Sequence, residues 1–330
     1  MNAIHCADLH IGESRHILPD LYLERQTMML YQILSAMMEH KARILIVAGD
    51  IFHSGTPLQI EKDALIKWLV KVDDYCLEVD GWAVFDAGNH DAASSDKTAL
   101  DTIRFLRTKL KRILVVLKPT MHVLHNYAFA CVPWNYDLRK TTKKLHAQLN
   151  QKVKKFFVVG HLPLPGITTD SGWFIKGSHR LLSLDFVDAF FLGDIHARFI
   201  SECGRLQMPG APMQHNWGDK LPKGISLVNL DSPHTPQLLN LNVTKFEVTK
   251  DIAKAKKSKN IVKYVGQVND EELPDNVVEV VSYLDEKEVA DYASEFNVVE
   301  GLPEFLAEKG CSKKQQVSAI KLIEKLCGEL

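Results

Sequence analysis

The chain has 330 residues, of which 40 are Lys or Arg and 41 are Asp or Glu, so its formal net charge is −1. Hydrophobic residues make up 46% and charged residues 25%, which is ordinary for a folded globular protein and excludes disorder, collagen or a coiled-coil rod as a description of the whole chain. No apolar run approaches the roughly 18–20 residues that span a bilayer, and the N-terminal residues do not form a secretion signal.

In chain order, short apolar runs alternate with longer segments of helical period. The runs predict strands at residues 43–48, 83–87, 128–132, 155–159, 189–192 and 225–230. Apolar residues at helical spacing between them predict helices around residues 30–38 and 65–72. This alternation is typical of a layered α/β domain.

The composition changes after about residue 242. Residues 250–263 hold six lysines and one Asp, whereas residues 269–300 hold eleven acids and one lysine. Near the end of the chain, Ile320, Ile323 and Leu326 lie near helical spacing. We therefore expect a main domain over residues 1–245, a small α/β module over 246–285 and a helical segment over 286–330.

Four of these apolar runs, and the apolar segment before Asp8 at the start of the chain, are followed by side chains that commonly bind metal ions. In chain order these are Asp8-Leu9-His10, Gly49-Asp50, Gly88-Asn89-His90-Asp91, Gly160-His161 and Gly193-Asp194-Ile195-His196. The carboxyl ends of parallel strands meet at one edge of a sheet, and glycine allows the sharp turn that brings a side chain into the crevice. A lone Gly-Asp is usually a turn, but five such ends in series predict one metal centre.

The donors are carboxylates, imidazoles and an amide, without a thiolate, and this set suits Mn²⁺, Fe²⁺ or Mg²⁺ better than structural zinc. The six scattered cysteines contain no C-x-x-C pair, which also argues against structural zinc and is typical of free thiols in a reducing cytoplasm. About seven ligands are too many for one ion, so we expect two divalent ions about 3.5–4 Å apart that share a carboxylate.

The series D-x-H, G-D, G-N-H-D, G-H and G-x-x-H resembles the calcineurin-like metallophosphoesterases. Asp8-Leu9-His10-Ile11-Gly12, Gly49-Asp50-Ile51-Phe52-His53 and the Pro209-Gly210 segment before Lys223-Gly224 are similar to the SbcD-type nucleases within that superfamily. The resemblance implies a four-layer α/β sandwich with a small α/β capping module, a C-terminal helical tail and the compact build of phage recombination endonuclease subunits. It also implies that the protein is located in the cytoplasm of a bacterium or of a phage-infected host cell.

Carried over position by position, the resemblance implies two ion sites that share Asp50, with Mn²⁺ favoured over Mg²⁺. One would be held by Asp8, His10, Asp50 and His196, and the other by Asp50, Asn89, His161 and Asp194. His90 would reach the scissile phosphate, Asp91 would orient His90, and His53 would contact the phosphate or lie behind the ligands. Asp194 departs from the family, which usually has histidine there; a carboxylate can still bind the ion, but it puts the metal preference in doubt.

Two basic stretches are candidates for phosphate contacts, and for each the alternative is an ordinary solvent-exposed surface. Residues 97–118 have seven cations and one acid, and their helical period favours a solvated helix face. Residues 139–155 have seven cations and no acid and are the better candidate for sequence-independent DNA contacts. The loop with Trp173 and Phe174 is equally compatible with base stacking and with core packing.

The first function hypothesis is a metal-dependent DNA exonuclease and endonuclease that acts in double-strand-break repair or recombination. The resemblance implies a homodimer through residues 57–77 and 96–112, and an SbcC-type coiled-coil ATPase bound to the C-terminal segment. The alternatives are a phosphoesterase for small or protein substrates and a non-catalytic scaffold that binds DNA ends. Only Asp194 favours the scaffold.

Overall fold

The computed structural model describes residues 1–265, 273 and 276–281, apart from residues 95–96, 171 and 178–179. One compact unit comprises Met1–Val248 and Lys257–Val262, and a second contains Thr249–Lys256 and the described residues from Lys263 onward. The helical segment expected over 286–330, with its apolar stripe, lies outside the described residues.

The first sheet of the larger unit has six strands in the order β12–β11–β1–β2–β3–β4. Four of them are parallel: β1 (Asn2–Cys6), β2 (Ile44–Ala48), β3 (Trp82–Asp86) and β4 (Ile113–Val116). The antiparallel strands β11 (Gly224–Asn229) and β12 (Gln237–Asn240) extend the edge beside β1.

The second sheet also has six strands, in the order β5–β6–β7–β8–β10–β9. Its parallel centre consists of β6 (Tyr127–Val132), β7 (Lys155–His161), β8 (Ala189–Gly193) and β10 (Leu206–Met208). Two antiparallel strands, β5 (Thr120–Leu124) and β9 (Phe199–Ile200), form its edges.

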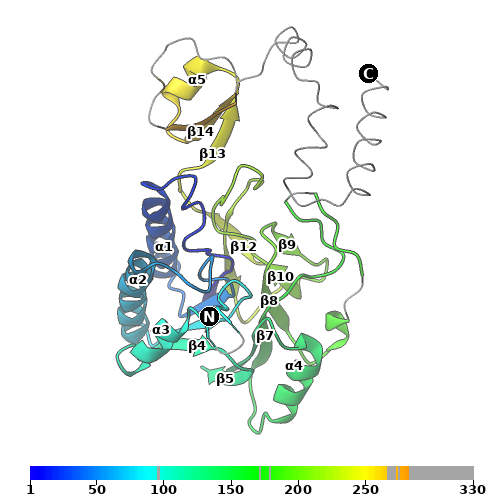
Figure 1. The fold of residues 1–330 in the computed structure, drawn as a ribbon. Coiled ribbons are helices and arrows are strands. Elements are labelled where there is room, and N and C mark those ends of the chain that lie inside the picture. The colour runs from blue at the N-terminus through cyan, green and yellow to red at the C-terminus, as the bar shows by residue number, and fades with distance from the viewer. Residues whose placement is uncertain (95–96, 171, 178–179, 266–272, 274–275, 282–330) are drawn as a thin grey trace, which may run out of the picture. The chain divides into compact units, whose positions relative to one another are not determined.

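The two sheets pack face to face between helices, which gives four layers (Figure 1). Along β2, Ile44 and Ile46 point into the layer between the sheets, whereas Leu45 and Val47 pack toward α1 (Tyr22–Glu39) and α2 (Gln59–Glu78). The second sheet is covered on its outer face by α4 (Leu138–Ala147) and the short helix η2 (Leu181–Ser183). Burial of both faces explains why the central strands read as continuous apolar runs.

The strands predicted from the sequence are confirmed with shifts of one or two residues at their ends, and the first two helices are confirmed but are longer than predicted. The expectation of a helix face over residues 97–118 is wrong in its extent. Only α3 (Asp101–Phe105) and the short helix η1 (Leu106–Thr108) are helical there, and the chain then forms β4. Pairing of β4 with β3, with Ile113 opposite Ala83, overrides the helical period of the sequence.

After β12 in the sequence, the chain forms β13 (Phe246–Thr249), α5 (Ile252–Lys257), β14 (Ile261–Val265) and β15 (Val277–Val281). The three strands form a sheet in the order β13–β14–β15. Among the described residues, no helix is both long and apolar enough to cross a bilayer.

Candidate metal centre

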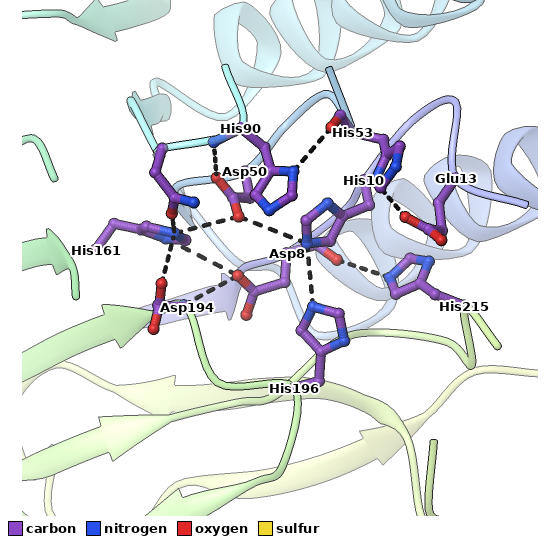
Figure 2. Close-up of polar contacts among 12 residues, drawn as sticks. Asp8, His10, Glu13, Asp50, His53, His90, His161, Asp194, His196 and His215 are labelled. Atoms are coloured by element: carbon purple, nitrogen blue, oxygen red, sulfur yellow. Dashed lines mark hydrogen bonds and ion pairs between the residues drawn. The ribbon is translucent and has the colours of Figure 1, made fainter. Parts of the chain in front are cut away.

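The five ligand-bearing strand ends predicted from the sequence meet at one point (Figure 2). Three come from β1, β2 and β3 of the first sheet, and two come from β7 and β8 of the second. Because the two sheets pack face to face, the carboxyl ends of their parallel strands open onto a common site.

The first group of donors consists of Asp8, His10 and His196, whose ligand atoms all lie within 4.8 Å of one another. The Nε2 atoms of His10 and His196 are 3.0 Å apart. Asp8 and His10 are buried and His196 is partly exposed, so the group opens to solvent on one side. Two imidazole nitrogens aimed at one point beside a carboxylate are suited to a divalent ion.

The second group surrounds the Nε2 atom of His161. Asn89 Oδ1 lies 3.0 Å from that nitrogen, Asp50 Oδ2 3.3 Å and Asp194 Oδ1 3.6 Å. Asp194 therefore points into the centre, at the position where the family usually has histidine.

Asp50 joins the two groups. Its Oδ2 atom is 3.5 Å from His10 Nε2 and 3.3 Å from His161 Nε2, so one carboxylate oxygen faces both donor sets. This is the arrangement that a carboxylate bridging two metal ions requires.

The electrostatics of the centre favour cations. Burial raises the pKa of Asp8 to about 6 and also raises the pKa of Asp194. Burial alone would lower the pKa of His161, but its contact with Asp50 and the charges of Asp8 and Asp194 raise that pKa to about 10. The Oδ2 atom of Asp8 is buried and accepts no hydrogen bond from the part of the chain that the structure describes. Three carboxylates and an unused oxygen fit a site for positive charge, whether a proton on His161 or metal ions.

The backbone at these strand ends is strained in a way that serves the site. Asp8, His10, Asp50 and Asp194 all have positive φ, between 44° and 100°, a region that non-glycine residues rarely adopt. Gly49 and Gly88 are needed for space, because a Cβ at Gly49 would lie 2.1 Å from His161 Nδ1 and one at Gly88 would lie 2.0 Å from Asp50 Oδ1.

Two further histidines lie at the mouth of the centre. The Nδ1 atom of His90 is 2.8 Å from the backbone oxygen of His53, and the two rings are stacked with their centroids 5.4 Å apart. The backbone N–H of His90 donates to Asp50 Oδ1 at 2.9 Å. His53 forms an ion pair with Glu13, so both imidazoles are held beside the first donor group.

The expectation that Asp91 orients His90 is wrong. The Asp91 carboxylate is fully buried and accepts hydrogen bonds from the backbone N–H groups of Phe52 and Gly88, each at 2.9 Å, and of Ile51 at 3.3 Å. The Nδ1 atom of His90 contacts the His53 carbonyl instead. Asp91 therefore fastens the loop that carries Asp50 to the loop that carries Asn89.

The sequence did not indicate which residues support the ligands. Asp219 Oδ1 lies 3.8 Å from His196 Nδ1, and Lys223 donates to the His196 carbonyl oxygen at 2.8 Å. His215, one of the histidines that the sequence left unassigned, is fully buried with its Nε2 3.0 Å from the Asp8 carbonyl oxygen. His179, another of them, lies outside the described residues. The contacts of Asp219, Lys223 and His215 join residues that are far apart in the sequence, so no local sequence pattern predicts them.

The sequence model of the calcineurin-like phosphoesterases matches residues 1–198 of this chain. No curated protein matches it significantly. Among solved structures, the protein TT1561 of Thermus thermophilus is 12% identical, with 73% of this chain and 99% of that chain covered and a TM-score of 0.48. A dimetal phosphatase from Danio rerio is 12% identical, with 70% and 92% covered and a TM-score of 0.41. A phosphoesterase from E. coli is 14% identical, with 73% and 94% covered and a TM-score of 0.35.

Proposed function

Because the chain belongs to the calcineurin-like phosphoesterase family, we propose that it is a two-metal DNA nuclease of the SbcD type. The observation that carries the hydrolytic part is the pair of donor groups that share Asp50, with His90 at their mouth. The choice of DNA as substrate rests on the motifs that resemble the SbcD-type nucleases and on the basic residues near the second sheet.

The residues divide the work as follows. Asp8, His10, Asp50 and His196 would hold one ion, and Asp50, Asn89, His161 and Asp194 the other. When bound, the two ions would polarise the phosphate and make a water molecule nucleophilic. The contact between His161 Nδ1 and the Ala48 carbonyl oxygen, at 2.9 Å, orients the imidazole so that Nε2 faces the centre.

His90 is placed to assist the departure of the leaving group. Its Nδ1–H donates a hydrogen bond to the His53 carbonyl oxygen, which leaves Nε2 as the ring nitrogen available to substrate. A histidine there steadies negative charge on the phosphate or donates a proton to the leaving oxygen. Such groups typically contribute about 10²–10⁴-fold in rate.

The basic face of α4 supports a polyanionic substrate. Lys140, Lys143 and Lys144 are exposed on this helix, whereas Leu138 and Leu145 pack into the core. Helix α4 begins shortly after β6, whose carboxyl end lies on the side of the sheet that carries the site. Lysines on such a surface give salt-sensitive, sequence-independent contacts to phosphates.

Two alternatives remain as rival outcomes. A phosphoesterase for small or protein substrates would use the same centre without the basic face. A non-catalytic scaffold is disfavoured because Asp194, its only support, points at His161 within the donor group.

The homodimer through residues 57–77 and 96–112 and the C-terminal contact with an SbcC-type ATPase belong to the same proposal. Helix α2 presents exposed Ile60, Val70 and Leu77 within the first of these ranges, which is compatible with a partner surface.

The test is incubation of end-labelled duplex, single-stranded and hairpin DNA with Mn²⁺ or Mg²⁺, with and without the ATPase. A phosphomonoester and a phosphodiester nitrophenyl ester serve as small substrates in parallel. The proposal predicts metal-dependent DNA cleavage and a preference for the diester. Hydrolysis of the monoester with intact DNA would support the phosphoesterase alternative, and no hydrolysis despite bound metal would support the scaffold.

A further inference from the structure

An exposed aromatic pair lies on a hairpin between two metal-binding strand ends. Trp173 is 72% exposed and Phe174 is 54% exposed. The hairpin stem, formed by residues 166–169 and 173–175, begins five residues after His161. The exposure of both rings excludes the core-packing interpretation that the sequence left open.

The stem is ordered by its own hydrogen bonds and by the core. Gly166 N–H donates to the Ile175 carbonyl at 2.8 Å, Ile175 N–H to the Ile167 carbonyl at 3.0 Å, and Thr169 N–H to the Trp173 carbonyl at 2.9 Å. Ile167 is buried in the core cluster on the outer face of the second sheet, and Ile175 packs against it. The aromatic pair is thus presented to solvent from a fixed base.

A buried ion pair ties the same hairpin to the metal centre. The ammonium of Lys223, a side chain only 5% exposed, forms an ion pair with Asp170 of the hairpin. The same ammonium donates to the carbonyl oxygen of His196 at 2.8 Å. The hairpin is therefore connected to the end of β7 through the chain and to the loop after β8 through Lys223.

Exposed cationic side chains follow the aromatic pair in the sequence. Lys176 and Arg180 follow it in the sequence and are exposed. Arg139 of α4 lies 3.3 Å from Ser183 Oγ, which connects the start of the lysine-bearing helix to the segment after the hairpin. Exposed aromatic rings combined with cationic side chains are the two elements by which proteins hold unpaired nucleic acid strands.

From these contacts we propose that Trp173, supported by Phe174, is a stacking platform for an unpaired nucleobase next to the scissile phosphate. This subsite rests on the proposed nuclease function and adds the form of the substrate: a DNA strand with at least one unstacked base near the cut. The rival outcome is that Trp173 and Phe174 form a docking surface for another protein. In that case the affinity for DNA would not depend on the presence of the base.

The test measures binding to single-stranded oligonucleotides that carry one abasic residue, moved in steps along the sequence. The His90→Asn background with Mn²⁺ keeps the DNA uncut, and fluorescence anisotropy gives the affinity. At one position, removal of the base should weaken binding by about 5- to 150-fold, the equivalent of the ~1–3 kcal/mol that a stacked base contributes.

In the same background, Trp173→Ala should weaken binding of the intact oligonucleotide by a similar factor and remove the sensitivity to the abasic residue. Trp173→Phe should retain most of the sensitivity to the abasic residue. The matched control is Tyr31→Ala on α1, an aromatic side chain 41% exposed on the outer helix layer, which should leave both affinities unchanged.

Two outcomes overturn the inference, and they are distinguishable. If Trp173→Ala keeps the full preference for the intact oligonucleotide while the wild-type protein cleaves DNA, the stacking subsite is refuted and the nuclease function stands. If the wild-type protein neither binds nor cleaves DNA, both fail together.

Discussion

Replacement of Asp91 by alanine should destabilise the protein strongly, because this side chain fastens two loops of the metal centre. Three buried backbone N–H groups, those of Ile51, Phe52 and Gly88, would lose their acceptor. Burial and the charge of Asp50 raise the pKa of Asp91 to about 7. Both the neutral and the ionised form of this carboxyl group are therefore populated near neutral pH. Each unsatisfied buried donor of this kind costs ~1–3 kcal/mol.

The three donors together give a loss of about 3–6 kcal/mol, since water that enters the space would satisfy part of them. For a unit of about 250 residues, the size of the larger unit that contains Asp91, each kcal/mol corresponds to about 2–4 °C, so Tm should fall by roughly 6–24 °C. Asp91→Asn keeps one carbonyl acceptor and should lose less. Thermal unfolding of both variants, with the exposed Asp20→Ala as control, measures the effect.

The same experiment separates the two roles of Asp91. If the side chain served mainly to orient His90, Asp91→Ala would lower the rate of hydrolysis while Tm stayed at the wild-type value. An unchanged Tm in the alanine variant would refute the fastening role derived from the three hydrogen bonds.

Three further predictions concern the chemistry of the centre. His90→Asn should lower cleavage by about 10²–10⁴-fold with unchanged metal content, and loss of metal by this variant would make His90 a ligand. Asp219→Asn should weaken Mn²⁺ binding by about 10–100-fold, because His196 loses its supporting carboxylate, and calorimetric affinity equal to wild type would contradict that role. Contacts with Asp50, Asp8 and Asp194, acting against burial, raise the pKa of His161 to about 10. The stability that its proton gives the metal-free protein is fully present below about pH 6.5 and is lost as pH rises toward that raised pKa. Because Mn²⁺ needs the neutral imidazole, the rise in Tm on adding Mn²⁺ should grow between about pH 6.5 and pH 8.5, and a rise independent of pH would argue against His161 as a ligand.

The strand ends could be predicted from sequence because their signal is local. An apolar run followed at once by glycine and a metal-binding side chain, as at Gly49-Asp50, predicts both the strand and the ligand at its carboxyl end. The burial of both faces of β2 also follows from its composition, since Ile, Leu and Val occupy consecutive positions.

The supports of the site could not be predicted in this way. Asp219 and Lys223 reach His196 from a segment without a distinctive pattern, and Glu13 reaches His53 across 40 residues of chain. Asp91 was misassigned because the role of orienting His90 was carried over from the family resemblance, whereas the fold offers its carboxylate three buried N–H groups. Such contacts depend on tertiary packing.

The central claim is that two ions sharing Asp50 cleave DNA phosphodiester bonds. Its most direct test is cleavage of labelled hairpin DNA as Mn²⁺ is added to metal-free protein, with the number of ions bound per chain measured at each step. The account predicts that cleavage appears with the second ion and that Asp50→Asn abolishes it. Full activity with one ion bound, or intact DNA with two ions bound, would contradict it.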